Sequence, residues 1–231
     1  FKDELKKPWL VRSAAIQSVS LNLPRVAYRA KGDDEKLLSL LSVYTARAVV
    51  AHIQKKDFLE KLLSYAEKGP LALLAMNRDD YPFIRMNRSY YVIGLVGLNE
   101  LVQIHTGSQL HESEQALDFG LKVVEYLRQE IMLATGKKVM KFVLEQSPAE
   151  TTAYRFARLD LKYFSPQAGH FVKGNIDEGA VYYTNSTHLN ISADLPYMQK
   201  VVSEGLFQEY LEGEVITHLQ ICLLYTSPSP R

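Results

Sequence analysis

The sequence predicts an α/β fold in which strands alternate with long helices. Apolar segments rich in Val, Ile or Leu at 16–23, 90–96 and 139–145 have the length and composition of strands. Amphipathic stretches at 35–67 and 112–135, with apolar residues at helical spacing, separate them. Strands joined through helices indicate crossover connections and a largely parallel sheet. The pattern does not decide between an open sheet and a barrel.

The first third of the chain carries clear boundary signals. The strand at 16–23 ends at Pro24, and Gly32-Asp33-Asp34 provides a turn and a helix N-cap. The helix that follows, at 35–67, is closed by Gly69-Pro70. Asn77-Arg78-Asp79-Asp80 then has the composition of a hairpin turn.

The remaining elements follow the same alternation. The strand at 90–96 runs into Gly97, and the helix at 112–135 is closed by Gly136. The other expected elements are helices at 98–105, 149–161 and 195–210 and strands at 181–184 and 213–221. With no internal repeat and no evident linker, residues 1–221 are expected to form one domain.

Composition and charge exclude several classes of protein. The chain has 231 residues, 27 basic and 26 acidic, and a net charge of +1. This balance gives no electrostatic reason to expect nucleic acid or an anionic membrane as a partner. No apolar run approaches the roughly 20 residues that span a bilayer, and no signal peptide opens the chain. We therefore expect a cytoplasmic protein.

The last ten residues, 222–231, differ in composition from the rest. They contain the single cysteine, Cys222, and a Ser-Pro repeat, and they resemble read-through of a sequencing adapter. A natural flexible tail is the alternative. If the tail is not native, the rest of the chain has no cysteine, which excludes a disulfide framework or a cysteine metal site there.

The segment Glu145-Gln146-Ser147-Pro148-Ala149-Glu150-Thr151-Thr152 joins a strand end to a helix start. Pro148 suits a helix entrance, and the free amides of the first turn would carry the positive end of the helix dipole. The hydroxyls of Ser147, Thr151 and Thr152 add donors, so the segment could hold a phosphate. Alternatively, Ser147 caps the helix and Glu150 completes a capping box.

Three further polar positions follow predicted strands. Asn22 could face a ligand or stop its strand by bonding to its own backbone. Asn99 and Glu100, at the helix start after Gly97, could face a site at the carboxyl end of a strand. Alternatively, the turn is only structural, and Gly94 and Gly97 allow close packing and a tight turn. Asn185 and His188 could line a pocket or belong to a simple turn. Asn99, Glu100, Asn185 and His188 are therefore candidates for a pocket.

The histidines give no metal motif: His52, His105, His111, His170 and His218 are scattered, and none forms a zinc-protease pattern. The sequence also lacks a P-loop, a Rossmann fingerprint and a nucleophile elbow. A hydrolase or a kinase is therefore not indicated.

Four of these segments resemble the anaerobic (class III) ribonucleotide reductases: EQSPAETTAYRFARLD, SVSLNLPRVAY, IGLVGLNE and YYTNSTHL. The resemblance implies that Ser147, Ala149, Glu150, Thr151 and Thr152 hold the phosphates of the substrate, mainly through backbone amides. It implies that Asn22 is the active-site asparagine that this class has where the aerobic classes use a glutamate. Asn99, Glu100, Asn185 and His188 match further family segments.

The resemblance also implies a fold and a reaction. The fold is a ten-stranded α/β barrel, of which this chain would contribute the second half. The reaction reduces ribonucleoside triphosphates to deoxyribonucleotides: a glycyl radical generates a thiyl radical, which removes the 3′ hydrogen, and the 2′ hydroxyl leaves as water. Implied partners are the triphosphate substrate, a radical-SAM activase and a second subunit in a homodimer.

The same resemblance places the thiyl cysteine, the radical glycine, a structural zinc and any ATP-binding regulatory domain outside this chain. We therefore expect an internal piece that carries no cofactor or metal and is inactive alone. Two alternatives remain open: a piece of another glycyl-radical enzyme of the formate-lyase kind, and a non-catalytic nucleotide-binding module.

Overall fold

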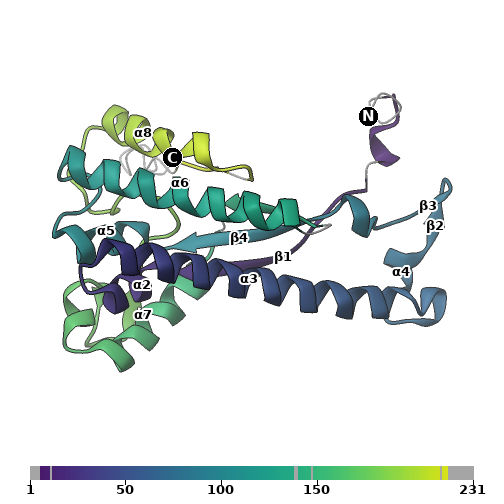
Figure 1. The fold of residues 1–231 in the computed structure, drawn as a ribbon, viewed down its shortest axis with the longest axis horizontal. Coiled ribbons are helices and arrows are strands. Elements are labelled where there is room, and N and C mark those ends of the chain that lie inside the picture. The colour runs from purple at the N-terminus through teal and green to yellow at the C-terminus, as the bar shows by residue number, and fades with distance from the viewer. Residues whose placement is uncertain (1–5, 11, 138–139, 147, 214, 218–231) are drawn as a thin grey trace, which may run out of the picture.

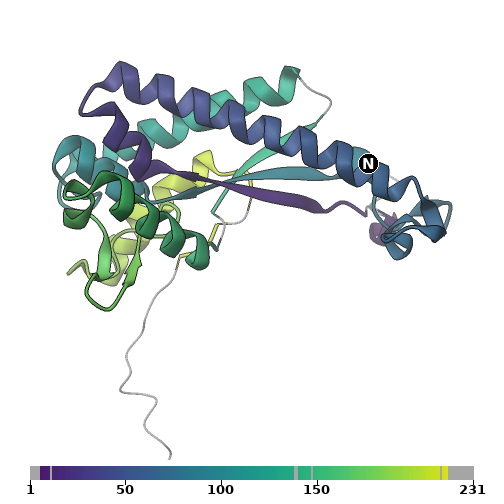
Figure 2. The same ribbon diagram turned by 90° about the horizontal axis from the view of Figure 1, so that it is seen from below.

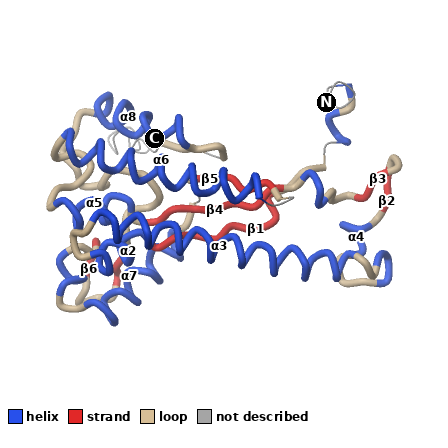
Figure 3. The backbone as a smooth tube through the Cα atoms, viewed as in Figure 1, coloured by secondary structure: helices blue, strands red, loops and turns tan. Residues whose placement is uncertain are grey.

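The computed structural model describes residues 6–10, 12–137, 140–146, 148–213 and 215–217. Its centre is a parallel sheet with the order β1-β4-β5 (Figure 3). The strands are β1 (Ala15–Asn22), β4 (Tyr90–Val96) and β5 (Lys141–Glu145). Within the described residues, the outer edges of β1 and β5 have no partner strand. The parallel sheet with intervening helices confirms the predicted α/β class and matches part of an α/β barrel.

One face of the sheet packs against two long helices, α3 (Asp34–Leu63) and α6 (Glu114–Lys137), as Figures 1 and 2 show. Alternate residues of the strands point to these helices and form the main core: Leu21, Tyr91, Ile93, Leu95, Phe142 and Leu144. Asp33 caps α3, because its side chain accepts the amide of Lys36 at 3.0 Å. The predicted turn and cap are therefore confirmed.

Two shorter helices follow β1 and β4 directly. They are α2 (Leu23–Ala30) and α5 (Leu98–Thr106), which pack against each other. Gly97 has a φ of 80°, and a Cβ there would lie 2.5 Å from the Cγ of Pro24. This position therefore requires glycine both for its backbone and for the close approach.

The other elements near the carboxyl ends of the strands form two groups. Helix α7 (Glu150–Phe164) packs against the antiparallel pair β6 (Lys173–Asn175) and β7 (Ala180–Tyr182) around a second apolar cluster. Helix α8 (Tyr197–Gly205) continues into the 3-10 helix η5 (Leu206–Tyr210), which packs against α6.

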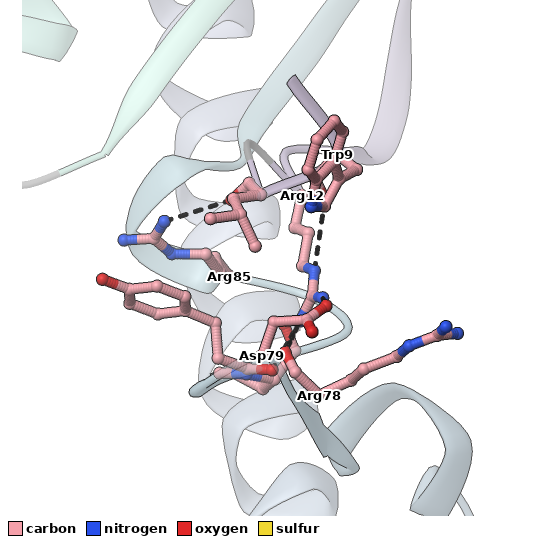
Figure 4. A network of polar contacts seen from close by, with 8 residues as sticks. Trp9, Arg12, Arg78, Asp79 and Arg85 are labelled. Carbon is pink, nitrogen blue, oxygen red and sulfur yellow. Dashed lines mark hydrogen bonds and ion pairs between the residues drawn. The ribbon is translucent and has the colours of Figure 1, made fainter. Parts of the chain in front are cut away.

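Helix α3 extends past the sheet to a far end with short elements (Figure 1). These are η1 (Pro8–Leu10), η2 (Ala66–Lys68), α4 (Ala72–Ala75), β2 (Asn77–Arg78), β3 (Tyr81–Pro82) and η3 (Met86–Arg88). The hairpin predicted at 77–80 is thus confirmed. Arg12 holds it, donating to the carbonyls of Arg78 and Tyr81 and to the carboxylate of Asp79 (Figure 4).

Helix α3 is long and apolar enough to cross a membrane by length and composition alone. In the fold its inner residues Leu37, Leu41, Ala48 and Val49 join the main core. A core helix of a water-soluble protein passes the same test, so α3 does not indicate a membrane protein.

Several predicted boundaries differ from the structure. The expected helix at 195–210 is divided into α8 and η5, and the short strand β6 was not predicted because Lys-Gly-Asn lacks strand-forming residues. The 3-10 helix η4 (Gln167–His170) was also not predicted. The strand expected at 213–221 does not form in its described residues, 213 and 215–217, and the rest of that range lies outside the described residues, as does 222–231.

Candidate functional site

The carboxyl ends of the three parallel strands meet at one edge of the sheet. There, residues 184–186, which follow β7 and are called the crossing segment below, cross the end of β4. The amide of Gly97 donates to the carbonyl of Thr184 at 2.8 Å, and the amide of Leu98 donates to the carbonyl of Ser186 at 3.3 Å. Val96 and Asn185 form an isolated antiparallel bridge. Sites in α/β folds form at this edge, so the crossing segment is where a ligand pocket is expected.

A pocket of about 580 Å³ lies beside this edge. It is enclosed by the first turn of α7, strand β7, the crossing segment and α8. Its lining residues are Glu150, Ala153, Tyr154, Ala180, Val181, Tyr182, Tyr183, Thr184, Asn185, His188, Leu189, Ile191 and Lys200. The pocket thus brings together three of the residues singled out in the sequence: Glu150, Asn185 and His188.

Helix α7 borders this pocket through Glu150, Ala153 and Tyr154. The helix begins at Glu150 with Ala149 as its N-cap, and no side chain caps it. The amide of Ala153 is the first to donate within the helix, to the carbonyl of Ala149 at 2.7 Å. The amides of residues 150–152 therefore lie before the helical hydrogen-bond ladder, at the positive end of the dipole. Thr151 is exposed and Thr152 half-buried, and neither they nor Ala149 line the pocket. Ser147 lies outside the described residues.

The opposite wall carries a buried carboxylate. Glu204 accepts the amide of Leu189 at 3.1 Å and the ring nitrogen Nδ1 of His188 at 3.4 Å. Burial acts to raise the pKa of Glu204, but the hydrogen bonds from His188 and Leu189 and the charge of Lys200 lower it overall. The ionised Glu204 therefore fixes His188 and Leu189 against α8.

Asn185 differs from its neighbours in its hydrogen bonding. Its side-chain oxygen is buried and accepts no hydrogen bond from any described group. A buried acceptor without a donor is uncommon in folded proteins. A donor on a bound ligand would satisfy it, since Asn185 lines the pocket.

Asn99 and Glu100 are fully buried behind the crossing segment and do not line the pocket. Glu100 accepts both the amide of Thr184, at 3.0 Å, and its hydroxyl. Asn99 donates to Gln109 at 3.1 Å and accepts the amide of Leu110 at 3.2 Å. Burial raises the pKa of Glu100, and the bonds from Thr184 oppose that shift. Glu100 therefore holds the pocket wall at Thr184, whereas Asn99 joins the start of α5 to Gln109 and Leu110.

Asn22 lies at the end of β1, 7% exposed, and is the N-cap of α2. Its side-chain oxygen accepts the amide of Arg25 at 3.2 Å, and its amide nitrogen donates to Asp160 of α7 at 3.0 Å. The local cap expected from the sequence therefore forms. The bond to Asp160 was not expected.

Sequence reasoning missed Tyr154, Lys200 and Asp160. Lys200 and Tyr154 are single polar or aromatic residues on amphipathic helices, where such residues usually face solvent. Asp160 has the same appearance in the sequence, although it is fully buried. One signal was available: Asp160 lies on the helix face that otherwise consists of Ala153 and Ala157, about three turns after Glu150.

No metal site is evident in the part of the chain that the structure describes. There, no three His, Cys, Asp or Glu side chains lie close enough to hold an ion.

Comparison with known proteins gives a consistent result. The family model "Anaerobic ribonucleoside-triphosphate reductase" matches residues 6–228. The reductase of Salmonella typhimurium is 29% identical over 207 residues, which is 87% of this chain and 28% of that protein. The chain thus spans less than a third of the length of this curated relative.

Two solved structures share the fold. An anaerobic ribonucleotide reductase superposes with a TM-score of 0.74 at 20% identity, over 94% of this chain and 32% of the other. The Thermotoga maritima enzyme in complex with dATP and CTP gives a TM-score of 0.70 at 20% identity, over 87% and 31%. The expected barrel type is therefore confirmed at the level of the fold.

Three observations agree on one family. The matched sequence segments occur in a consistent order, the parallel strands have a pocket at their carboxyl ends, and the family model matches nearly the whole chain. The chain belongs to the anaerobic ribonucleoside-triphosphate reductase family.

Proposed function

We propose that this chain is one segment of a longer anaerobic ribonucleoside-triphosphate reductase, and that it supplies the surface that holds the phosphates of the substrate. The observation that carries this proposal is the first turn of α7, whose amides lie before the helical hydrogen bonds and whose first residue, Glu150, lines the 580 Å³ pocket. Family membership favours this reading over an enzyme of the formate-lyase kind, which has no phosphate to bind.

The chemistry of the pocket suits a nucleotide. The dipole of α7 favours an anion, and the apolar walls from Val181, Leu189 and Ile191 suit a flat, weakly polar group. The side chain of Glu150 would repel a phosphate, so we assign its contribution to its backbone amide. A relative from Thermotoga maritima is described in complex with dATP and CTP, which supports a nucleotide as the ligand.

We assign the bond-breaking groups to the rest of the longer protein. The family reaction needs a thiyl cysteine and a glycyl radical, and the one cysteine here, Cys222, lies outside the described residues. In this proposal Asn22 is the group that hydrogen-bonds the ribose hydroxyls. We further propose that the longer protein carries a structural zinc outside this segment and forms a homodimer. In this proposal a radical-SAM activase generates its glycyl radical, and the protein is cytoplasmic. The chain alone is expected to be inactive.

The test is the double substitution Thr151→Val and Thr152→Val in the full-length enzyme, with CTP as the probe. Loss of two hydroxyl donors to a charged phosphate should weaken CTP binding by roughly tenfold, measured by isothermal titration calorimetry without radical activation. Ser39→Ala removes a hydroxyl from an exposed face of α3 and is the matched control. Unchanged CTP binding in the double variant would mean that this turn only starts a helix.

A further inference from the structure

A buried network joins three parts of the fold around Asp160. Asp160 lies on α7 with none of its surface exposed. It accepts hydrogen bonds from Asn22 at 3.0 Å, from Nε of Arg25 at 2.7 Å and from the hydroxyl of Tyr183 at 3.1 Å. Arg25 also forms an ion pair with it. The hydroxyls of Tyr183 and Tyr28 lie 3.3 Å apart. The end of β1, helix α2 and the segment after β7 therefore converge on one carboxyl group.

A buried carboxylate is tolerated only when it is paired and hydrogen-bonded, because transfer of an isolated charge from water costs several kcal/mol. Burial raises the pKa of Asp160, while Asn22, Arg25 and Tyr183 oppose that shift. Such a group contributes little net stability compared with apolar packing. Its hydrogen bonds are directional, however, so it can fix the orientation of the groups that bind it.

The network determines the orientation of the Asn22 amide. The amide oxygen accepts from the backbone of Arg25, and the nitrogen donates to Asp160. A flipped amide would place its nitrogen against an N–H donor and its oxygen against a carboxylate, and both contacts would be repulsive. One amide hydrogen and one oxygen lone pair are left after these two bonds, which is what a group that binds a hydroxyl requires.

We propose that Asp160 is a positioning residue that orients the Asn22 amide toward the substrate ribose, an inference that rests on the function proposed above. Asp160 lies ten residues after Glu150, so about 15 Å of helix separates it from the first turn of α7. Its loss should therefore affect the step that uses Asn22 more than the binding of phosphate.

The test is Asp160→Asn in the activated full-length enzyme, with CTP as substrate and turnover divided by the glycyl radical content measured by electron paramagnetic resonance. The variant keeps the shape of the side chain and removes its charge. We expect kcat to fall about tenfold, with the KM for CTP within about twofold of the wild-type value. The double variant Asn22→Ala, Asp160→Asn should be no slower than Asn22→Ala alone, since both changes remove one interaction.

Glu130→Gln is the matched control. It makes the same carboxyl-to-amide change on α6, where Glu130 accepts the hydroxyl of Ser42 at 2.6 Å, away from the pocket. It should leave kcat unchanged. If Asp160→Asn does not fold, Arg25→Lys is the milder variant. Lysine keeps the positive charge but has one nitrogen in place of the two nitrogens of Arg25 that contact Asp160. This variant should lower kcat severalfold with an unchanged KM.

The outcomes separate the two proposals. A wild-type kcat in Asp160→Asn, or in Arg25→Lys where the first variant does not fold, overturns the positioning role and leaves the proposed function standing. Equal losses in kcat and CTP affinity, or additive losses in the double variant, also overturn it, because they indicate general distortion. A wild-type enzyme that carries its radical but reduces no CTP overturns the proposed function and this inference with it.

Discussion

The two ends of the sheet are stabilised in different ways. At the pocket end, the buried carboxylates of the described chain, Glu100, Asp160 and Glu204, each bind groups from distant elements. At the far end, Arg12 binds the backbone of a hairpin, and Asp79, its charged partner, has a side chain that is 54% exposed. Trp9 and Leu73 are exposed there. Removing one partner of a buried hydrogen bond to a charged group costs more unfolding free energy than removing one partner of a solvent-exposed ion pair. The pocket end is therefore expected to be the rigid one.

The largest effect is expected from Glu100→Ala. The amide and the hydroxyl of Thr184 would both lose their buried acceptor, which should cost about 3 kcal/mol of unfolding free energy. The measurement is the urea midpoint of the full-length enzyme. Glu100→Gln retains an acceptor and should lose less than half as much. Equal losses in the two variants would show that the volume of the side chain matters and its hydrogen bonds do not.

A smaller effect is expected from the titration of Glu204. Its pKa is lowered from the ordinary value of 4.5, so its contribution to stability is fully present above that value and is lost as pH falls through the lowered folded value. Thermal midpoints measured downward from pH 6 should therefore fall more steeply in the wild-type enzyme than in Glu204→Gln. Parallel curves for the two proteins would contradict the lowered pKa.

The smallest global effect is expected at the far end. Arg12→Ala removes the donors that hold the hairpin, and it should cost about 1–2 kcal/mol, because the Arg12 side chain is only 8% exposed while its partner Asp79 is 54% exposed. Limited proteolysis within 77–82 should accelerate, while CTP binding stays the same. Arg12→Lys keeps the charge near Asp79 and should be cut at an intermediate rate. A loss of CTP binding in Arg12→Ala would show that the far end also supports the pocket, which contradicts the separation of the two ends proposed here.

The parts of the fold that could be predicted from sequence are those set by local patterns. Strand β4 was predicted with its observed bounds, because a continuous apolar run ends at Gly97. The cap at Asp33 and the hairpin at 77–80 follow from turn chemistry in the same way. The split between α8 and η5 was not predictable, because the apolar spacing continues through both.

The pocket was predicted less completely, because its walls depend on contacts between distant residues. The bond from Asn22 to Asp160 joins positions 138 apart in sequence, and that from Thr184 to Glu100 joins positions 84 apart. A buried carboxyl on a helix has the same local pattern as a solvated one. The sequence could therefore indicate which segments end at the site but not which side chains support it.

Among the described residues the outer edge of β1 has no partner strand, and this has a further consequence for how a longer polypeptide would complete the structure. A strand that added in parallel beside β1 would run in the same direction as its neighbours. Its carboxyl end would then lie next to Asn22, at the same edge of the sheet as the ends of β1 and β4. The shared direction of the strands thus determines that the carboxyl end of an added parallel strand, and not its amino end, lies beside Asn22, whatever the sequence of the loop that follows it.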